Sequence, residues 1–557
     1  MRTPLAIPEA QPQHEYAPVI HEHEIVQTEK ISINLPGRDF AVFLLLLLAV
    51  DISSLLHIYN LTRLYNEYFF LGVGFFLALC AVLLLLPGYE LPRWLRLPAW
   101  RPLQTLGALL CLGLAVGSLF MLMRAASHAP DWYLSSHPND VLSVPVARIL
   151  LLGSIAGAAL LAGGISYARN ERLRRVLLPV LAGAWFAVSV VTLLFLMGVG
   201  DSVAATWAAL IGSGWLVPGA VGLLVLVLLL TQVGPRVFMV VTLGVGLVLR
   251  VIALPAIDVS VKHGDMLPLV QLSTTRLLQG QNPYVVYQLP WDLPLTYWPL
   301  TMLSYTPFTA LGLDIRWANL LLAPVLCALL WGRATRPGAI ACYAIGLLYL
   351  IPAMLQWDIT TEAPVFWLWL SVAFALSSAP APWPGVGIGL ATACSPLALP
   401  FAPFLLAHWM SKSKREALVN LAGAVGAGAM LVLPFLLWNF SGFWAGAVTW
   451  FNDINSLPRL KWDTDRTWLF ENGLAGPFWL HGWEHWLKPL QALLIGGLFL
   501  LALRVRLNLA AALRWGTAGF LLFMVFNPVI WPYLYVPALV GLVFAMSYAA
   551  PSGLNSH

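Results

Sequence analysis

The sequence predicts an all-α polytopic membrane protein with about 16 transmembrane helices, and three observations lead to this fold class. The 557-residue chain is 60% hydrophobic, only 10% charged and has a mean hydropathy of +0.80, which leaves too little polar surface for a soluble globular fold. Apolar runs recur along the chain at roughly 17 to 25 residues, the length that spans a hydrocarbon core as a helix. The alternating pattern of membrane strands is absent, and backbone groups in lipid must be paired internally, so the runs are interpreted as helices.

The first part of the chain consists of a tail and an extension. Residues 1–39 are polar and predict a disordered cytoplasmic tail, in which the HEHE run could instead bind a metal. Candidate spans follow near 41–60, 67–87, 103–124, 146–168, 175–199, 205–231 and 237–256. The first six spans form an N-terminal six-helix extension, 40–235. Basic loops (PRWLRLPAWR, ARNERLRR, VGPR) follow the second, fourth and sixth spans, which predicts a cytoplasmic N-terminus.

Residues 236–550 form a second helical module, and 551–557 a cytoplasmic tail. The further spans of this helical module are predicted near 314–332, 337–353, 363–379, 384–395 paired with 396–410, 417–437, 488–503, 509–526 and 530–548. The basic connections RATRPG, SKSKRE and RVRLN then fall inside, so both termini are cytoplasmic. Pro299, Pro307, Pro396, Pro400 and Pro403 permit broken or re-entrant helices in 298–312 and in the short pair.

Two carboxylates, Asp258 and Asp265, follow the seventh span on the predicted extracytoplasmic side. An ionised group in lipid costs several kcal/mol, so acids at the end of a span indicate a wet, functional site. In a helix, a spacing of seven would place both on one face, although Gly264 and Pro268 make a continuous helix uncertain. Asp258 could instead cap the end of its span.

Asp265 is followed by an amphipathic stretch, by a G-x-N-P-Y element (Gly280, Asn282, Pro283, Tyr284) and by a Tyr/Pro-rich segment, LTYWPLTMLSYTPFTALGLDIRWANLLLAP. This arrangement resembles the GT-C superfamily of membrane glycosyltransferases, in the branch of mannosyltransferase-like and arabinosyltransferase-like enzymes that use polyprenyl-phosphate sugars. The resemblance covers roughly residues 237–548. It implies transfer of a sugar, with inversion, to a lipid, glycan or protein acceptor on the extracytoplasmic face of the cell membrane.

The resemblance implies that Asp265 is the general base, with Asp258 as the alternative. A carboxylate within hydrogen-bond reach of a sugar hydroxyl can accept its proton as the anomeric carbon is attacked. The phosphate that leaves needs cations or backbone donors, and the candidates are Lys262, Arg276, Arg316, Arg459, Lys461 and Arg466. Arg316 could equally pair with Asp314, and Arg276 could be the polar side of an amphipathic helix.

Further substrate-binding residues are predicted from the outer segments. They are Asn282, Tyr284, Tyr297, Asp358 and Glu362, together with Arg276, Arg459, Lys461 and Arg466. Asp358 and Glu362 are four residues apart, so on one helix they would share a face and could bind the acceptor or a divalent ion. Glu362 could also cap the following span. Trp531, Tyr533 and Tyr535 could line the cavity as an aromatic platform.

No metal ligands and no cofactor are assigned, while a divalent cation stays open. Asp463 and Asp465 in KWDTDRTW resemble a D-x-D metal motif, and His481 and His485 have a zinc-compatible spacing. Interleaved tryptophans favour packing of the histidine segment at the membrane headgroups. The net charge of +5 is dispersed over short loops, which argues against nucleic-acid binding.

Two other functions fit the same composition. A transporter or flippase of lipid-linked sugars would also need a wet cavity, but it predicts inverted repeats with polar groups at the midplane, which the sequence lacks. An O-antigen-ligase-like enzyme would rely on Arg459, Arg466 and His481 rather than on Asp265.

Overall fold

The computed structural model describes residues 233–450 except 256, 262–263, 290–291 and 335–337, and residues 481–549 except 528–530. It also describes scattered positions within 39–50, 77–85, 224–228 and 474–478. Contacts divide the chain into two compact units, Met1–Asn34 and Leu35–His557, and every described element belongs to the second. The tails and almost all of the six-helix extension, 40–235, lie outside the described residues.

The described part of the chain is predominantly helical, as the hydropathy predicts. Three helices are long and apolar enough to cross a membrane: α8 (Pro235–Ala253), α18 (Lys414–Trp438) and the segment Glu484–Val505, which contains α22 (Leu487–Val505). A bent pair, α13 (Ala339–Leu350) and α14 (Pro352–Thr360), would make a fourth span. The total of about sixteen spans stays a prediction.

Shorter helices complete the order of elements. Those before the bent pair are α9 (Met266–Leu278), α10 (Pro299–Ala310), α11 (Trp317–Leu320) and α12 (Leu322–Trp331). Those after it are α15 (Ala363–Leu376), α16 (Trp383–Cys394), the 3-10 helix η4 (Pro396–Phe401), α17 (Ala402–Lys412), α19 (Phe440–Phe443), the π-helix η5 (Trp444–Thr449), the 3-10 helix η6 (Glu484–Trp486), α23 (Leu509–Val525), the 3-10 helix η7 (Pro532–Tyr535) and α24 (Val536–Ser547).

Prolines divide some of the apolar runs. The predicted span 337–353 continues into α14 through a 66° bend at Pro352, because proline lacks the N–H that a continuous helix needs. The predicted short pair is α16, η4 and α17, and η4 carries Pro396 and Pro400. The break expected in the short pair is therefore found, whereas α10 runs through Pro307 without a break and the bend at Pro352 was not expected.

Glycines allow α16 and α18 to approach closely. A Cβ at Gly385 would lie 1.8 Å from the Asn420 carbonyl oxygen, and one at Gly389 would lie 2.3 Å from that of Ala424. Small residues of this kind let helix backbones come together when neither lipid nor water separates them. This contact links α18 to the rest of the bundle.

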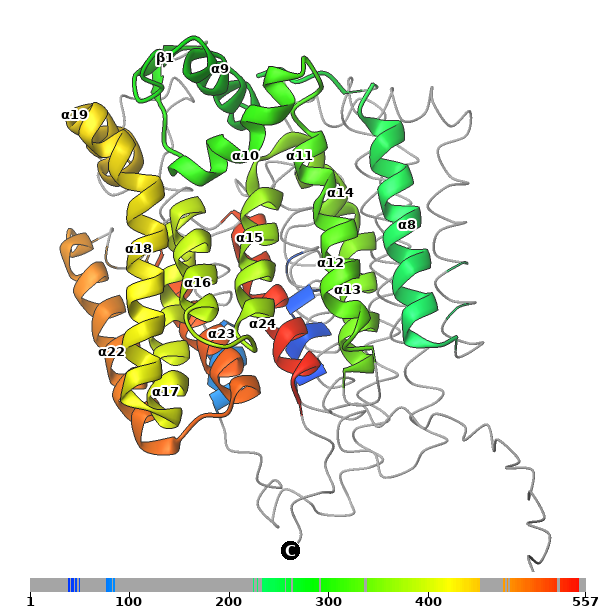
Figure 1. The fold of residues 1–557 in the computed structure, drawn as a ribbon, viewed down its shortest axis with the longest axis vertical. Helices are drawn as coiled ribbons and strands as arrows, with labels where there is room; N and C mark the ends of the chain where they lie inside the picture. Colours follow the sequence, from blue (N-terminus) through cyan, green and yellow to red (C-terminus); the bar gives the residue numbers. More distant parts are fainter. Residues whose placement is uncertain are drawn as a thin grey trace, which may run out of the picture. The chain divides into compact units, whose positions relative to one another are not determined.

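The connection between α8 and α11 lies at one end of the bundle, where α9 and the β1 strand are seen beside α10 (Figure 1). Strands β1 (Val286–Gln288) and β2 (Asp292–Pro294) form an antiparallel hairpin in which Tyr287 faces Leu293. The all-helical expectation did not include this hairpin, because three-residue strands are too short to produce a sequence pattern. Both residues are buried between helices.

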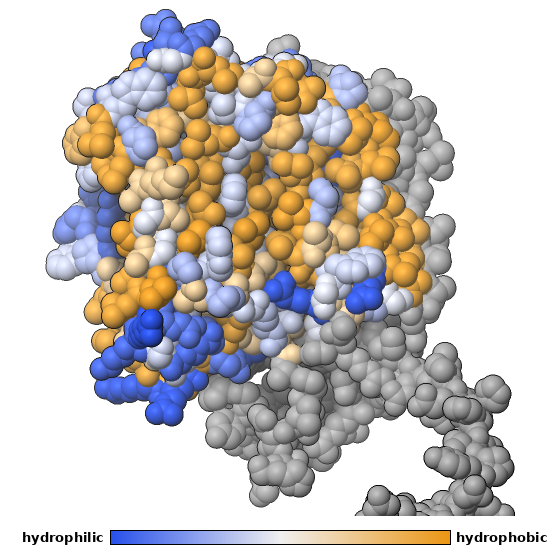
Figure 2. Space-filling model, viewed as in Figure 1, coloured by the Kyte–Doolittle hydropathy of each residue, from blue (hydrophilic) through white to orange (hydrophobic). Residues whose placement is uncertain are grey.

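The surface is consistent with a membrane protein. Figure 2 shows apolar residues over the middle of one face. Polar residues gather near the basic ends of three helices, where α17 and α22 end and α18 begins. Those ends include Lys412, Lys414, Arg415, Arg504 and Arg506. At the start of α23, Arg514 forms an ion pair with Asp39, with a shortest N–O distance of 2.5 Å. The beginning of the first predicted span therefore lies beside the beginning of α23.

Candidate active site

The described residues between Asp258 and Asp265 are not helical. Helix α8 ends at Ala253 and α9 begins at Met266, so the two carboxylates do not share a helical face. Gly264 has φ +151°, a conformation that disfavours side chains, and a Cβ there would lie 3.2 Å from the Thr360 carbonyl oxygen. This glycine lets the loop pass against the end of α14, just before Asp265.

Asp265 occupies the N-cap position of α9, but its side chain does not cap the helix. It lies near Glu362 and Tyr297, and Tyr297 hydrogen-bonds to the Glu362 side chain. Asp258, in contrast, is exposed. The structure therefore brings together three of the predicted site residues, Asp265, Glu362 and Tyr297, from three separate segments.

Burial, with a smaller contribution from the Asp265 charge, raises the pKa of Glu362 from 4.5 to about 7. Hydrogen bonds from its own backbone and from Tyr297 oppose this shift. Burial and the two carboxylates also hold the pKa of Tyr297 well above its ordinary value, so its hydroxyl keeps its proton. The Oε2 atom of Glu362 is buried without a hydrogen-bond partner. At neutral pH this carboxyl group can therefore accept or release a proton.

The predicted common helical face of Asp358 and Glu362 is wrong. Asp358 belongs to α14, Thr361 is extended (φ −126°, ψ 165°), and Glu362 precedes α15. Pro364 at the start of α15 causes the break, because proline cannot continue the hydrogen bonds of the preceding turn. Glu362 does occupy the N-cap position, but without a side-chain capping bond. The two acids consequently point to different surroundings.

Asp358 is fully buried and its Oδ2 accepts a hydrogen bond from Arg250 Nε of α8. Arg250 also donates to the Gly246 and Tyr349 carbonyl oxygens, at 2.9 and 3.0 Å, and its guanidinium lies 3.6 Å from the centroid of the Tyr349 ring. A buried charge needs such partners. Its other oxygen, Oδ1, is buried and has no hydrogen-bond partner among the described residues. The predicted substrate contact of Asp358 stays a prediction.

Arg316 shows the ion pair that was the alternative to phosphate binding. Its guanidinium contacts the Asp314 carboxylate at 2.5 Å and also donates to the Ile257 and Leu254 carbonyl oxygens, at 2.5 and 2.7 Å. These oxygens lie just after α8, where a helix presents unpaired carbonyls and negative partial charge. Arg316 is only 2% exposed and fastens α11 to the end of α8.

The G-x-N-P-Y element builds local structure. Gly280 has φ +71° just after α9, and Arg276 Nε donates to the Asn282 carbonyl oxygen at 3.1 Å. Asn282 Oδ1 accepts from the Tyr284 backbone N–H at 2.8 Å, an Asx-type turn. Asn282 Nδ2 is buried and lacks a hydrogen-bond partner in the described structure. The Arg276 side chain therefore binds the backbone of Asn282. The predicted substrate contacts of both residues stay predictions.

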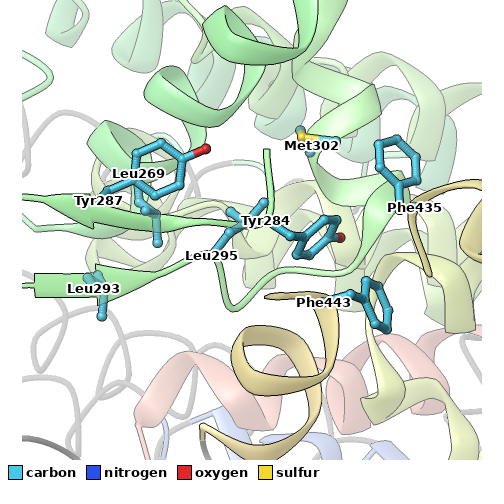
Figure 3. Close-up of a cluster of buried hydrophobic side chains, with 8 residues drawn as sticks. All are labelled: Leu269, Tyr284, Tyr287, Leu293, Leu295, Met302, Phe435 and Phe443. Atoms are coloured by element: carbon cyan, nitrogen blue, oxygen red, sulfur yellow. The ribbon is translucent and has the colours of Figure 1, made fainter. Parts of the chain in front are cut away.

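Tyr284 is 1% exposed and lies in an apolar cluster. Figure 3 shows its ring directed toward Phe435 and Phe443, away from the strands, and the ring centroids are 5.9 and 4.8 Å apart. Its hydroxyl donates to the Tyr297 carbonyl oxygen at 2.9 Å. Tyr284 is thus buried and fixes the backbone of Tyr297, and its predicted substrate contact stays a prediction.

Aromatic rings border the carboxylates on another side. Tyr533 of η7 lies near Glu362 and Asp265, with Trp531 and Trp357 at ring-centroid distances of 5.8 and 6.3 Å from it. Of the platform expected from the FNPVIWPYLYVP segment, Tyr533 thus lies beside the acids and Trp531 packs against it. Flat apolar faces next to polar groups are a common arrangement for binding sugars and isoprenoids.

Several predicted residues cannot be placed. Lys262, Arg459, Lys461 and Arg466 lie outside the described residues, as do Asp463 and Asp465. His481 and His485 do not share a helix, because the first turn begins at Glu484. Each packs on a tryptophan, His481 on Trp483 and His485 on Trp486, at 5.0 and 5.4 Å.

Among the described residues no three His, Cys, Asp or Glu side chains form a group that could hold a metal ion. Asp265 and Glu362 are two carboxylates in one place, and Mg²⁺ is commonly held by one or two carboxylates together with substrate phosphates. The divalent cation stays open.

Sequence reasoning missed Arg250 and Asn319. Arg250 is a lone cation at the end of an apolar run, a pattern that indicates a buried acidic partner. Asn319 is fully buried and contacts the residues around Glu362, but an asparagine in an apolar segment gave no signal of its partners.

No known protein family, no characterised protein and no solved structure matches this chain.

Proposed function

We propose that this chain is an inverting GT-C-type glycosyltransferase with about sixteen spans, which moves a sugar from a polyprenyl phosphate to a lipid, glycan or protein acceptor. One observation carries the proposal. Asp265, the residue that the resemblance marks as the base, lies with Glu362 and Tyr297 at one end of a bundle of apolar helices. Burying acids at such a place costs free energy, so their presence indicates a functional site.

The chemistry follows from the two carboxyl groups. The acceptor hydroxyl gives its proton to Asp265 while its oxygen attacks the anomeric carbon, and the bond to the phosphate oxygen breaks with its electron pair leaving on the phosphate. A single displacement inverts the anomeric centre. Two neighbouring carboxyl groups together favour uptake of a proton, which suits a pair that must act as a base. Tyr297 orients Glu362 within the pair.

We further propose that the site faces the extracytoplasmic side and that both termini are cytoplasmic. The Arg514–Asp39 pair supports this orientation, since it joins the start of α23, after the basic RVRLN connection, to the start of the first predicted span. Basic residues favour the cytoplasmic side. The ends of α8 and α14 that lead to the carboxylates then emerge on the opposite side.

The test is transfer of radiolabel from a panel of polyprenyl-phosphate sugars in proteoliposomes, with analysis of the anomeric configuration of the product. Transfer from one donor with inversion supports the proposal. Transfer only from a preassembled glycan on a pyrophosphate lipid would identify a ligase. Movement of labelled lipid-linked sugar across the bilayer without transfer would identify a flippase and overturn the proposal.

A further inference from the structure

The break between α14 and α15 is held by one buried side chain. Asn319 of α11 donates both amide hydrogens to main-chain carbonyl oxygens, that of Asp358 at 2.7 Å and that of Thr361 at 2.8 Å. These carbonyls lie at the end of α14, where the helical ladder no longer pairs them. An asparagine side chain suits this place because it offers two donors and an acceptor in one plane.

The acceptor of Asn319 is used as well. Tyr305 of α10 donates its hydroxyl to Asn319 Oδ1 at 2.5 Å, and the same hydroxyl lies 3.3 Å from the Glu362 carbonyl oxygen. Both Tyr305 and Asn319 are fully buried. Asn319 and Tyr305 therefore bind the backbone on both sides of the break, immediately before and at Glu362.

The chain that leads into α10 supplies the other contact to Glu362. Tyr297 lies two residues before α10 and hydrogen-bonds to the Glu362 side chain, while Tyr305 lies within the helix. The backbone of Glu362 is thus contacted by Tyr305, and its carboxyl group by Tyr297. The Arg250–Asp358 pair holds the neighbouring turn of α14 against α8.

We propose that Asn319, together with Tyr305, is a positioning residue that sets the orientation of the Glu362 carboxyl group toward Asp265. The inference rests on the proposed function, because it concerns the same site. Removing either partner releases the break, and Glu362 then rotates away from Asp265 and toward solvent. The titratable groups that face Glu362 from the surrounding elements are Asp265, Tyr297, Tyr305, Cys394 and Tyr533.

The experiment measures the protonation of Glu362 directly, without any substrate. Infrared spectra of purified protein in nanodiscs are recorded between pH 5 and 9, and the carboxyl band of Glu362 is identified by its loss in Glu362→Gln. In the wild type the midpoint is expected near pH 7. In Tyr305→Phe and in Asn319→Leu it is expected to fall by about one pH unit, toward the value of a solvated carboxyl group.

Tyr343→Phe is the matched control. Tyr343 of α13 also donates a buried hydroxyl to a main-chain oxygen, that of Val233 at 2.7 Å, but away from Glu362. In Tyr343→Phe the midpoint of the Glu362 band is expected to stay at the wild-type value. An unchanged midpoint in folded Tyr305→Phe, an equal shift in Tyr343→Phe, or the absence of a Glu362 band that titrates in this range would overturn the inference.

Turnover separates this inference from the proposed function. If the wild type transfers a sugar, Tyr305→Phe is expected to lower kcat about tenfold with KM within about twofold, since misplacement affects the reacting geometry more than binding. A shifted midpoint in a protein that transfers no sugar would leave the positioning role intact and reject the glycosyltransferase. An unshifted midpoint in a protein that transfers sugar would reject the positioning role and leave the proposed glycosyltransferase intact. If Asn319→Leu does not fold, Tyr305→Phe, which removes one oxygen atom, decides the result.

Discussion

At the residue scale, the account depends on how a few charged side chains are accommodated among apolar helices. Glu362 retains a proton up to about pH 7 because it is buried beside a second carboxylate. Arg250 and Asp358 take the other course and neutralise each other. The first arrangement leaves a reactive group, whereas the second stabilises a helix contact.

The raised pKa of Glu362 predicts a pH-dependent gain of stability in Glu362→Gln. The folded-state pKa lies above the unfolded value, so the wild type loses stability as pH rises from about 4.5 to about 7, and the glutamine removes this loss. The Tm of the variant in detergent is expected to exceed that of the wild type by a few degrees at pH 8 and to equal it near pH 5. Glu416→Gln, in an exposed pair with Lys412, is the control and should change Tm little at either pH. A pH-independent difference would contradict the burial of Glu362.

The Arg250–Asp358 pair predicts that the effects of substituting its two residues on stability are not additive. Arg250→Met leaves the Asp358 carboxylate buried without its cation and is expected to cost about 3 to 5 kcal/mol. Adding Asp358→Leu is expected to recover most of this loss, because both charges are then gone. The measurement is a thermal-unfolding cycle of the four proteins, and additive effects of the two substitutions would argue against the pair.

At the element scale, the fold depends on close helix contacts and on proline breaks. The α16–α18 contact predicts that Gly389→Ala destabilises the protein by about 1 to 3 kcal/mol, since its Cβ would meet the Ala424 carbonyl oxygen at 2.3 Å. Gly426→Ala on the same α18 is the matched control, because nothing lies within 4 Å of its Cβ. It is expected to be neutral or to gain up to about 1 kcal/mol from helix propensity. Equal thermal shifts for the two variants would count against the contact.

The sequence predicted elements better than contacts. Apolar runs marked α8, α10 and α18 within a few residues, because burial in lipid or in a bundle requires whole turns of apolar side chains. The hairpin and the break before Glu362 were not predicted in this form, since they depend on short segments and on Pro364.

The pairing of side chains across helices was also beyond the sequence. Arg250 and Asp358 are separated by 108 positions, and spacing along a chain says nothing about such a pair. The packing of Tyr284 against Phe435 and Phe443 was likewise not predicted from the sequence. Asp265 and Glu362 were singled out because acids between apolar segments are conspicuous, and the role of Asp265 as base rests on the resemblance and stays a prediction.

At the scale of the whole molecule, the proposed orientation predicts which residues are reachable from outside the cell. Gln288→Cys, exposed on strand β1, is expected to react with a membrane-impermeant maleimide on intact cells. Lys414→Cys, exposed at the start of α18, is expected to react only after permeabilisation. The wild type is the control for its own cysteines, of which Cys80, Cys342 and Cys394 are buried. Labelling of both variants on intact cells, or the reverse pattern, would reject the orientation.

The most direct test of the account compares sugar transfer by the wild type with that by Asp265→Asn and Asp258→Asn, at matched amounts of folded protein in proteoliposomes. The account predicts a loss of about 100-fold or more in kcat for Asp265→Asn, the usual cost of removing a general base, and a change within about threefold for Asp258→Asn. Wild-type activity in Asp265→Asn, or a comparable loss in Asp258→Asn alone, would contradict the assignment of the base.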